Sequence, residues 1–233
     1  MSEGQKQNGS ILNVTRADQY HTVEELFRKS EPNSVYYALL IISVFIIASG
    51  LLLGNSAIVI GGMLVTPLLT PILVIALSFI VGNFRAIRNT SIIMTKSFLL
   101  VIAVSGLLAF VFGAPKNIEM LENTMRTAVL YFIVAIAAGM AGTFAWTRKD
   151  VAEVLPGIAI AVSLVPPLAL MGIWLSSLNF DAVRFSFLVF LFNFLGILVG
   201  SVAAFILMKF HRAERLIEEK AEIQVEEAAK KEK

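Results

Sequence analysis

The chain lacks cysteine and is poor in charge: none of its 233 residues is Cys, and only 15% are Asp, Glu, Lys or Arg. The missing thiols exclude disulfides, thiolate metal sites and a cysteine nucleophile. Soluble domains usually carry about 25% charged residues, so the low charge and a mean hydropathy of +0.80 place the chain in the membrane class. A net charge of +2, spread along the chain, gives no support to a nucleic-acid partner.

Ionisable groups are also scarce inside the apolar part of the sequence. Both histidines, His21 and His211, lie in the polar ends, and no Asp or Glu falls inside an apolar segment unless Glu153 enters the mouth of one. This composition argues against an intramembrane protease, a metal site or a buried-carboxylate proton relay. We predict that the protein is not an enzyme and uses no cofactor.

Long charge-free stretches predict the membrane spans, because an ionised side chain in hydrocarbon is costly. The longest stretch, residues 32–84, divides naturally at Gly54-Asn55. Each resulting segment is long enough to cross about 30 Å of hydrocarbon as a helix. The sequence therefore predicts an all-α membrane protein with six transmembrane helices, at residues 35–53, 57–81, 91–112, 127–146, 152–175 and 185–208.

Lysine and arginine residues predict the orientation of these spans. Ten of them flank one side: Arg28, Lys29, Arg85, Arg88, Arg148, Lys149, Lys209, Arg212, Arg215 and Lys220. Three flank the other: Lys116, Arg126 and Arg184. By the positive-inside rule, both termini are predicted to lie in the cytoplasm, which makes the chain a multi-pass protein of the cytoplasmic (inner) membrane.

The two polar ends predict short cytoplasmic elements. Residues 1–34 have no apolar core typical of a signal peptide, and Thr22-Val23-Glu24-Glu25 has capping-box spacing, which predicts a short surface helix. Residues 209–233 carry opposite charges four apart, such as Arg215 and Glu219, as a solvated helix does. An oligomerising coiled coil is the alternative for this tail.

Two blocks of sequence recur and divide the membrane domain, residues 35–208, into halves. Residues 57–68 match residues 157–168 at six positions, and Asn83-Phe-Arg-Ala-Ile-Arg88 matches Asn179-Phe-Asp-Ala-Val-Arg184. The chain is therefore interpreted as two three-helix repeats, at about 35–112 and 127–208. Three is an odd number of spans, so the repeats must be inverted relative to each other in the membrane.

Prolines fall inside the second span of each repeat. Thr66-Pro67 and Pro71 interrupt the second span, and Pro166-Pro167 interrupts the fifth. Proline removes a backbone donor and clashes with the preceding turn, so we expect both spans to be broken. Matched broken spans in inverted repeats are typical of a transporter site near the membrane midplane. The alternative is that the prolines only bend helices for packing.

The candidate site consists of the prolines and the few polar residues inside the spans. Ser97 and Asn193 occupy equivalent places in the two repeats, and hydrogen bonding between helices is their alternative role. Lys96 lies near the cytoplasmic start of the third span, where a snorkelling lysine is the plainer interpretation. The full candidate set is Thr66, Pro67, Thr70, Lys96, Ser97, Ser163, Pro166, Pro167 and Asn193.

The break in the second span also suggests the charge of the solute. Thr66 and Pro67 have the residue types of a helix N-cap and a first helical position. Two helix N-termini, beginning at Pro67 and Pro167, would then converge on one site and favour an anion. In the competing interpretation, carbonyl groups near Val65 and Val165 hold a neutral or cationic solute.

Two motifs carry a resemblance to a known family. The strings are Ile58-Val-Ile-Gly-Gly-Met-Leu-Val-Thr-Pro-Leu68 and Leu155-Pro-Gly-Ile-Ala-Ile-Ala-Val-Ser-Leu-Val-Pro-Pro-Leu168. In them the chain resembles the prokaryotic uncharacterised hydrophobic domain, domain-of-unknown-function family 389, over residues 35–208. The resemblance implies a prokaryotic multi-pass protein of the cytoplasmic membrane and supplies no substrate. Gly62 stands where alanine is usual in this family.

Two functions from different classes follow. The first is a carrier or channel for a small solute, with an anion favoured, and the second is a non-transporting membrane scaffold or sensor. A wet cavity reaching Thr66 and Ser163 would favour transport, and a dry, packed centre would favour a scaffold. The lipid bilayer is the expected partner, and the apolar surface of the spans also predicts a homo-oligomer, although lipid could cover the same surface.

Overall fold

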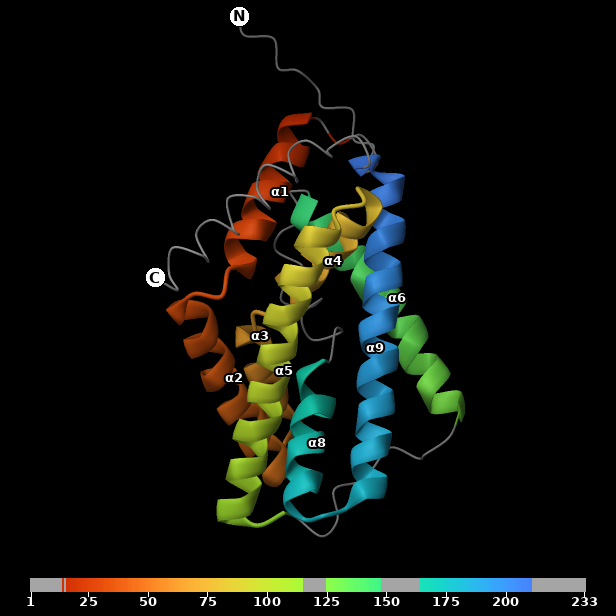
Figure 1. Ribbon diagram of the computed structural model, residues 1–233. Helices are drawn as coiled ribbons and strands as arrows, with labels where there is room; N and C mark the ends of the chain where they lie inside the picture. The colour runs from red at the N-terminus through yellow and green to blue at the C-terminus, as the bar shows by residue number, and fades with distance from the viewer. Residues whose placement is uncertain (1–13, 15, 115–124, 148–163, 211–233) are drawn as a thin grey trace, which may run out of the picture.

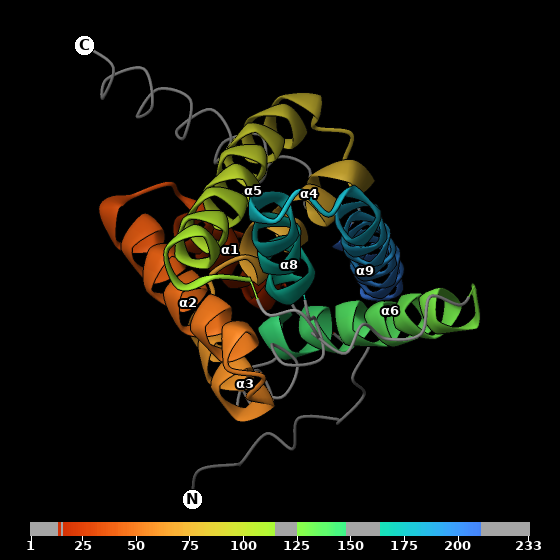
Figure 2. The same ribbon diagram turned by 90° about the horizontal axis from the view of Figure 1, so that it is seen from below.

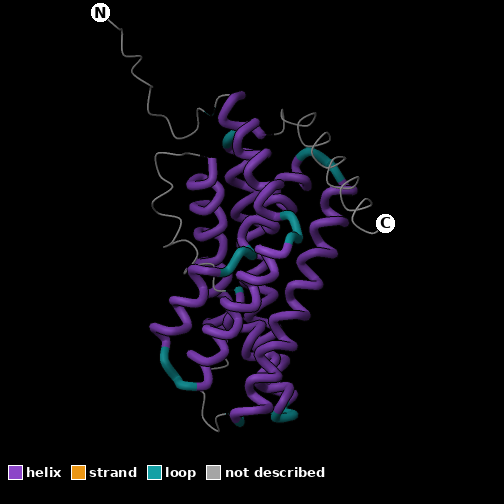
Figure 3. Tube along the Cα trace, turned by 90° about the vertical axis from the view of Figure 1, so that its left-hand side faces the viewer, coloured by secondary structure: helices purple, strands orange, loops and turns teal. Residues whose placement is uncertain are grey.

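The computed structural model describes residues 14, 16–114, 125–147 and 164–210, and over these residues the chain is helical, with no strand (Figure 1). Short loops connect consecutive helices within residues 16–112 and within residues 165–207 (Figure 3). The predicted all-α class is therefore confirmed. The helices are α1 (Arg16–Ser30), α2 (Ser34–Leu52), α3 (Ser56–Val65), α4 (Leu69–Ile80), α5 (Phe84–Phe112), α6 (Met125–Thr147), α8 (Val165–Ser176) and α9 (Phe180–Leu207).

Four of these helices, α2, α5, α6 and α9, are long and apolar enough to cross a membrane. The bent pair α3 and α4 gives up to a fifth span within the described residues. The first part of the predicted fifth span, residues 152–163, lies outside the described residues, and α8 forms its second part. The predicted tail helix also lies outside them, apart from Lys209 and Phe210. The chain is thus a multi-pass membrane protein by length and composition.

The helices α5 and α9 begin earlier than the apolar pattern predicts, at Phe84 and Phe180 instead of residues 91 and 185. The reason is that charge marks the end of an apolar run and not the end of a helix: Arg85, Arg88 and Arg184 lie in the first turns. Asparagine sets the true start. The side-chain oxygen of Asn83 accepts from the Ala86 N–H at 2.9 Å, and that of Asn179 accepts from the Ala182 N–H at 3.2 Å.

The same turn precedes both of these caps. Asn83 and Asn179 have nearly identical backbone angles, φ −81°, ψ 82° and φ −87°, ψ 82°. The residue before each has positive φ, 72° at Gly82 and 56° at Leu178. Two segments 96 residues apart therefore adopt one local conformation, as the recurring sequence block predicts.

The predicted surface helix exists as α1, but it starts before the expected capping box. Thr22 lies inside the helix, and its hydroxyl donates to the carbonyl of Asp18 at 2.7 Å. The predicted N-cap role of Thr22 is therefore wrong, because the helix already extends back beyond this threonine. Val23, Leu26 and Phe27 are buried in a cluster with side chains of α4 and the end of α9. The helix α1 is thereby attached to the membrane domain.

The central helix is α8, which lies among α2, α5, α6 and α9 when viewed along the bundle (Figure 2). From the interior, α4 runs toward the end that carries α1, and α8 runs toward the opposite end (Figure 1). Glycines permit the close approaches between helices. A Cβ at Gly200 would overlap the carbonyl of Ile136 on α6, and one at Gly172 would lie 2.9 Å from the backbone nitrogen of Gly106 on α5.

Candidate functional site

The predicted break in the second span is present. The helix α3 ends at Val65, Pro67 and Leu68 form a turn, and α4 starts at Leu69 after a bend of 55°. Thr66 does not cap α4, so the predicted N-cap role is wrong: it is the C-cap of α3, and its hydroxyl donates back to the carbonyl of Gly62 at 3.2 Å. The physical reason is that a residue before proline is extended, and a threonine hydroxyl readily bonds the carbonyl four residues back.

The break lies beside the first half of α2. A Cβ placed on Gly62 would lie 3.0 Å from the carbonyl oxygen of Ser43 and 3.0 Å from the backbone nitrogen of Ile47. Thr66 follows four residues later, about 6 Å further along the axis of α3. Because α3 folds back along α2, this step places Thr66 beside residues 39–43 of the 19-residue helix α2.

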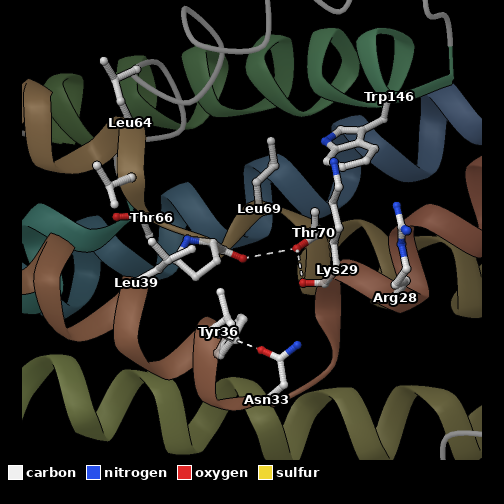
Figure 4. Close-up of a pocket in the computed structure, with 13 residues that line it drawn as sticks. Arg28, Lys29, Asn33, Tyr36, Leu39, Leu64, Thr66, Leu69, Thr70 and Trp146 are labelled. Carbon is white, nitrogen blue, oxygen red and sulfur yellow. Dashed lines mark hydrogen bonds between the residues drawn. The ribbon is translucent and has the colours of Figure 1, made fainter.

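A cavity of about 690 Å³ connects this break to the junction of α1 and α2 (Figure 4). Its walls come from five helices, α1, α2, α3, α4 and α6, and from the turns between them. The residues that line it are Arg28, Lys29, Asn33, Val35, Tyr36, Leu39, Leu64, Val65, Thr66, Pro67, Leu69, Thr70 and Trp146. Of the predicted site residues, Thr66, Pro67 and Thr70 meet here.

Two basic side chains lie at the α1 end of the cavity. The ammonium of Lys29 lies 4.5 Å from the centre of the Trp146 ring, toward which it extends in Figure 4. Arg28 lies 3.5 Å from the carboxylate of Glu25. None of the described residues that line the cavity is acidic. The cavity therefore combines positive charge with the π-face of an indole.

The two threonines at the break already use their hydroxyl protons within the chain. Thr66 donates to Gly62, and Thr70 donates to the carbonyls of Pro67, at 3.2 Å, and Lys29, at 3.4 Å (Figure 4). The bond to Lys29 connects the start of α4 directly to the end of α1. Of the polar groups in the cavity, the ammonium of Lys29 is therefore better placed than either hydroxyl to donate to an anion.

Ser97 lies one hydrogen bond away from the cavity. It is fully buried on α5, it donates to the carbonyl of Ile93 at 3.0 Å, and its oxygen lies 3.0 Å from the hydroxyl of Tyr36. Tyr36 itself lines the cavity. Ser97 thus has the interhelical role that was its alternative interpretation, and it connects α5 to α2.

The other predicted residues are not brought to this cavity. Lys96 is exposed on α5, and Asn193 is buried on α9. Pro166 and Pro167 lie in the first turn of α8, which begins at Val165, two residues before the predicted start at Pro167, whereas α4 begins two residues after the predicted start at Pro67. Ser163 lies outside the described residues.

The starts of α4 and α8 both lie in a buried apolar cluster. The N-cap residues of these helices are Leu68 and Leu164, each only 2% exposed. Both belong to one buried cluster that also holds Val165 and Leu168. The N-cap side chains of both helices are thus aliphatic and buried, whereas Thr66 and Thr70 line the cavity.

Sequence reasoning missed the α1 end of the cavity. Arg28 and Lys29 entered the sequence analysis only as cations that predict the orientation of the spans. Their positions did contain a signal, since a basic pair precedes the first span and a tryptophan ends the fourth. What the sequence did not reveal is that α1 contacts α6, which brings Lys29 to Trp146.

Comparison with known proteins gives a family and one distant relative. Residues 63–199, more than half of the chain, match the family described as "Domain of unknown function (DUF389)". An uncharacterised protein of Methanocaldococcus jannaschii is 22% identical over 192 residues, which cover 82% of this chain. The chain spans about three fifths (59%) of the length of that relative. No solved structure matches the chain.

Proposed function

This chain belongs to the DUF389 family, and from that premise we propose that it is a membrane carrier or channel for a small solute, with an anion favoured. The observation that carries the proposal is the cavity that extends from Lys29 to a helix broken beside the first half of α2. Broken helices that border a cavity are where transporters bind their solutes. A substrate would enter at the α1 end, which we propose is cytoplasmic.

The preference for an anion rests mainly on side chains. Lys29 and Arg28 supply positive charge, and the described lining residues include no carboxylate. The start of α4 adds less than the sequence suggested, because Leu68 is its N-cap and Pro71 lacks an N–H. We therefore assign the electrostatic attraction to Lys29 first and to the helix dipole second.

The proposed architecture has six spans in two inverted repeats, in a cytoplasmic membrane with both termini inside, and we propose that the protein forms a homo-oligomer. Two observations support the repeat. The matching turns at Asn83 and Asn179 relate equivalent places in the two halves, and α4 and α8 run from the interior toward opposite ends (Figure 1). Opposite directions are what an inverted repeat requires of its two half-helices.

One observation favours the alternative, a scaffold or sensor that transports nothing. The buried apolar cluster includes Leu68, Leu164, Val165 and Leu168, each at most 3% exposed, as in a packed bundle. A carrier has to open this cluster once per cycle, whereas a scaffold leaves it closed.

Cysteine labelling distinguishes the two functions, because the natural chain contains no thiol. Single variants Thr66→Cys, Leu69→Cys and Leu168→Cys, in inverted membrane vesicles, are treated with a charged, membrane-impermeant thiol reagent. We expect labelling at residues 66 and 69 from the α1 side for either function, since both line the cavity. Labelling at residue 168, which is 2% exposed, is expected only if the cluster opens.

Flux measurements test transport itself. Purified protein in liposomes is assayed for uptake of radiolabelled anions and of matched cations, with Lys29→Gln beside the natural protein. Anion uptake that falls in the variant supports the proposal. Selective cation uptake would overturn the anion preference. If residue 168 is not labelled and neither anions nor cations are taken up, the result favours the scaffold function.

A further inference from the structure

One end of the cavity is positively charged and the rest of its wall is mostly apolar, which indicates the class of ligand that it binds. The inference rests on the proposed function. We propose that it binds an amphiphilic anion: a molecule with one negatively charged oxygen-bearing head group and an apolar tail. The head would lie at Lys29 and the tail along α2 and the end of α3.

The head-group end is defined by Lys29 and Trp146. The lysine ammonium lies 4.5 Å from the indole ring centre, and this cation–π contact favours a position at the cavity. Arg28 lines the same end but already lies 3.5 Å from Glu25, which leaves Lys29 as the main donor to a carboxylate or phosphate.

The remainder of the wall is mostly aliphatic. Val35 and Leu39 on α2 and Leu64 on α3 line the cavity and are also exposed at the surface, by 65%, 38% and 47%. In a membrane, the surface of these helices faces lipid, so an apolar tail could extend from the cavity without entering water.

Size also argues against a small inorganic ion as the complete ligand. The cavity holds about 690 Å³. One water molecule in the liquid takes roughly 30 Å³, so an ion the size of a few waters would fill only a minor part of it. The volume falls in the range of pockets for organic ligands, about 300–1,000 Å³. An inorganic anion would also leave the aliphatic wall without a partner.

Trp146 provides the measurement, because the chain has only one other tryptophan, Trp174, whose buried indole nitrogen has no hydrogen-bond partner among the described residues. In a Trp174→Phe background, the protein is placed in phosphatidylcholine nanodiscs and the emission of Trp146 is recorded. Decanoate is the amphiphilic anion, decyltrimethylammonium the cation of matched tail, and nitrate and inorganic phosphate the anions without a tail. We expect a saturable change with decanoate only.

Two variants and their matched controls locate the two ends of the ligand. Lys29→Gln should weaken decanoate binding roughly tenfold, as expected for the loss of a hydrogen bond to a charged group. Its control is Arg85→Gln, an exposed cation that does not line the cavity. Leu39→Ser should also weaken decanoate binding, and its control is Leu99→Ser, an exposed leucine of α5 outside the cavity.

The source of the ligand is settled by changing the lipid. If phosphatidylglycerol in the nanodisc competes with decanoate, the amphiphile comes from the bilayer; if it does not, the ligand is a free amphiphile, and either result supports the class. Three results would overturn the proposal that the ligand is an amphiphilic anion. They are decyltrimethylammonium binding as tight as decanoate binding, phosphate or nitrate binding as tight as decanoate binding, and unchanged decanoate affinity in Lys29→Gln. Flux is measured separately, so decanoate binding without flux refutes only transport, and flux of small anions without decanoate binding refutes only this inference.

Discussion

The buried contact between Tyr36 and Ser97 allows a prediction whose sign follows from the direction of one hydrogen bond. Ser97 has one hydroxyl proton, and that proton is donated to the carbonyl of Ile93. With the Ser97 proton on Ile93, we assign the donor role in the 3.0 Å contact to the hydroxyl of Tyr36. The two residues are 3% and 0% exposed, so neither hydroxyl is well placed to find bulk water.

The two single substitutions should then have unequal costs. Tyr36→Phe removes the donor and leaves Ser97 bonded to Ile93, so only one interhelical bond is lost, worth about 0.6 kcal/mol on average in membrane proteins and up to about 1.7 kcal/mol. Ser97→Ala leaves the Tyr36 hydroxyl buried without its acceptor, at a cost of about 1–3 kcal/mol. We expect Ser97→Ala to be the more destabilising by roughly 1 kcal/mol.

A double-mutant cycle provides the test. The free energy of unfolding is measured in mixed micelles for the natural protein, both single variants and the double variant. The double variant should cost less than the sum of the single variants, because the stranded hydroxyl is absent from it. A Tyr36→Phe variant that costs more than Ser97→Ala, or a coupling energy near zero, would refute the assigned direction of the bond.

Three further predictions follow from other contacts. Gly200→Val should destabilise the fold by about 1–3 kcal/mol in the same unfolding assay, since its side chain would overlap the Ile136 backbone, whereas Gly61→Ala, with nothing within 4 Å, should be neutral or slightly stabilising. Leu178→Gly should stabilise the protein by up to about 1 kcal/mol, because φ is 56° at this residue in the turn before α9. Gly82→Leu at the equivalent turn should destabilise the protein. A loss of stability in Leu178→Gly would contradict the argument that Leu178 is strained. Lys29→Gln should lower anion uptake about tenfold at subsaturating anion concentration. Its free energy of unfolding should change by less than about 0.5 kcal/mol, because the Lys29 side chain is exposed. Equal uptake by the variant and the natural protein would contradict the role of Lys29.

The sequence predicted those features that depend on local chemistry. Charge-free length identified α2, α5, α6 and α9, proline identified the break after Val65, and the recurring asparagine blocks identified two equivalent turns. Helix starts were placed less well, since Arg85 and Arg184 lie inside helices whose caps are asparagines.

Features that depend on which helices meet were not predictable in this way. The approach of Lys29 to Trp146 requires α1 to lie against α6, and the pairing of Tyr36 with Ser97 requires a particular rotation of α2 against α5. Apolar spans carry little information about rotation or neighbours, because lipid and protein interior offer similar surroundings to a leucine. The role of Thr66 was unpredictable for a local reason. A threonine can cap either end of a helix, and its backbone angles show that Thr66 is the C-cap of α3.

The prolines near the starts of α4 and α8 affect the stability of the protein when no ligand is bound. When a helix is interrupted within hydrocarbon, backbone N–H groups at the interruption lose their hydrogen-bond partners. Each unpaired group costs several kcal/mol. Here Pro67 and Pro71 remove two such donors around the start of α4, and Pro166 and Pro167 remove two from the first turn of α8. The interruptions therefore demand little from any bound molecule or water. In the carrier that we propose, the empty state would therefore leave few unsatisfied donors at these two helix ends.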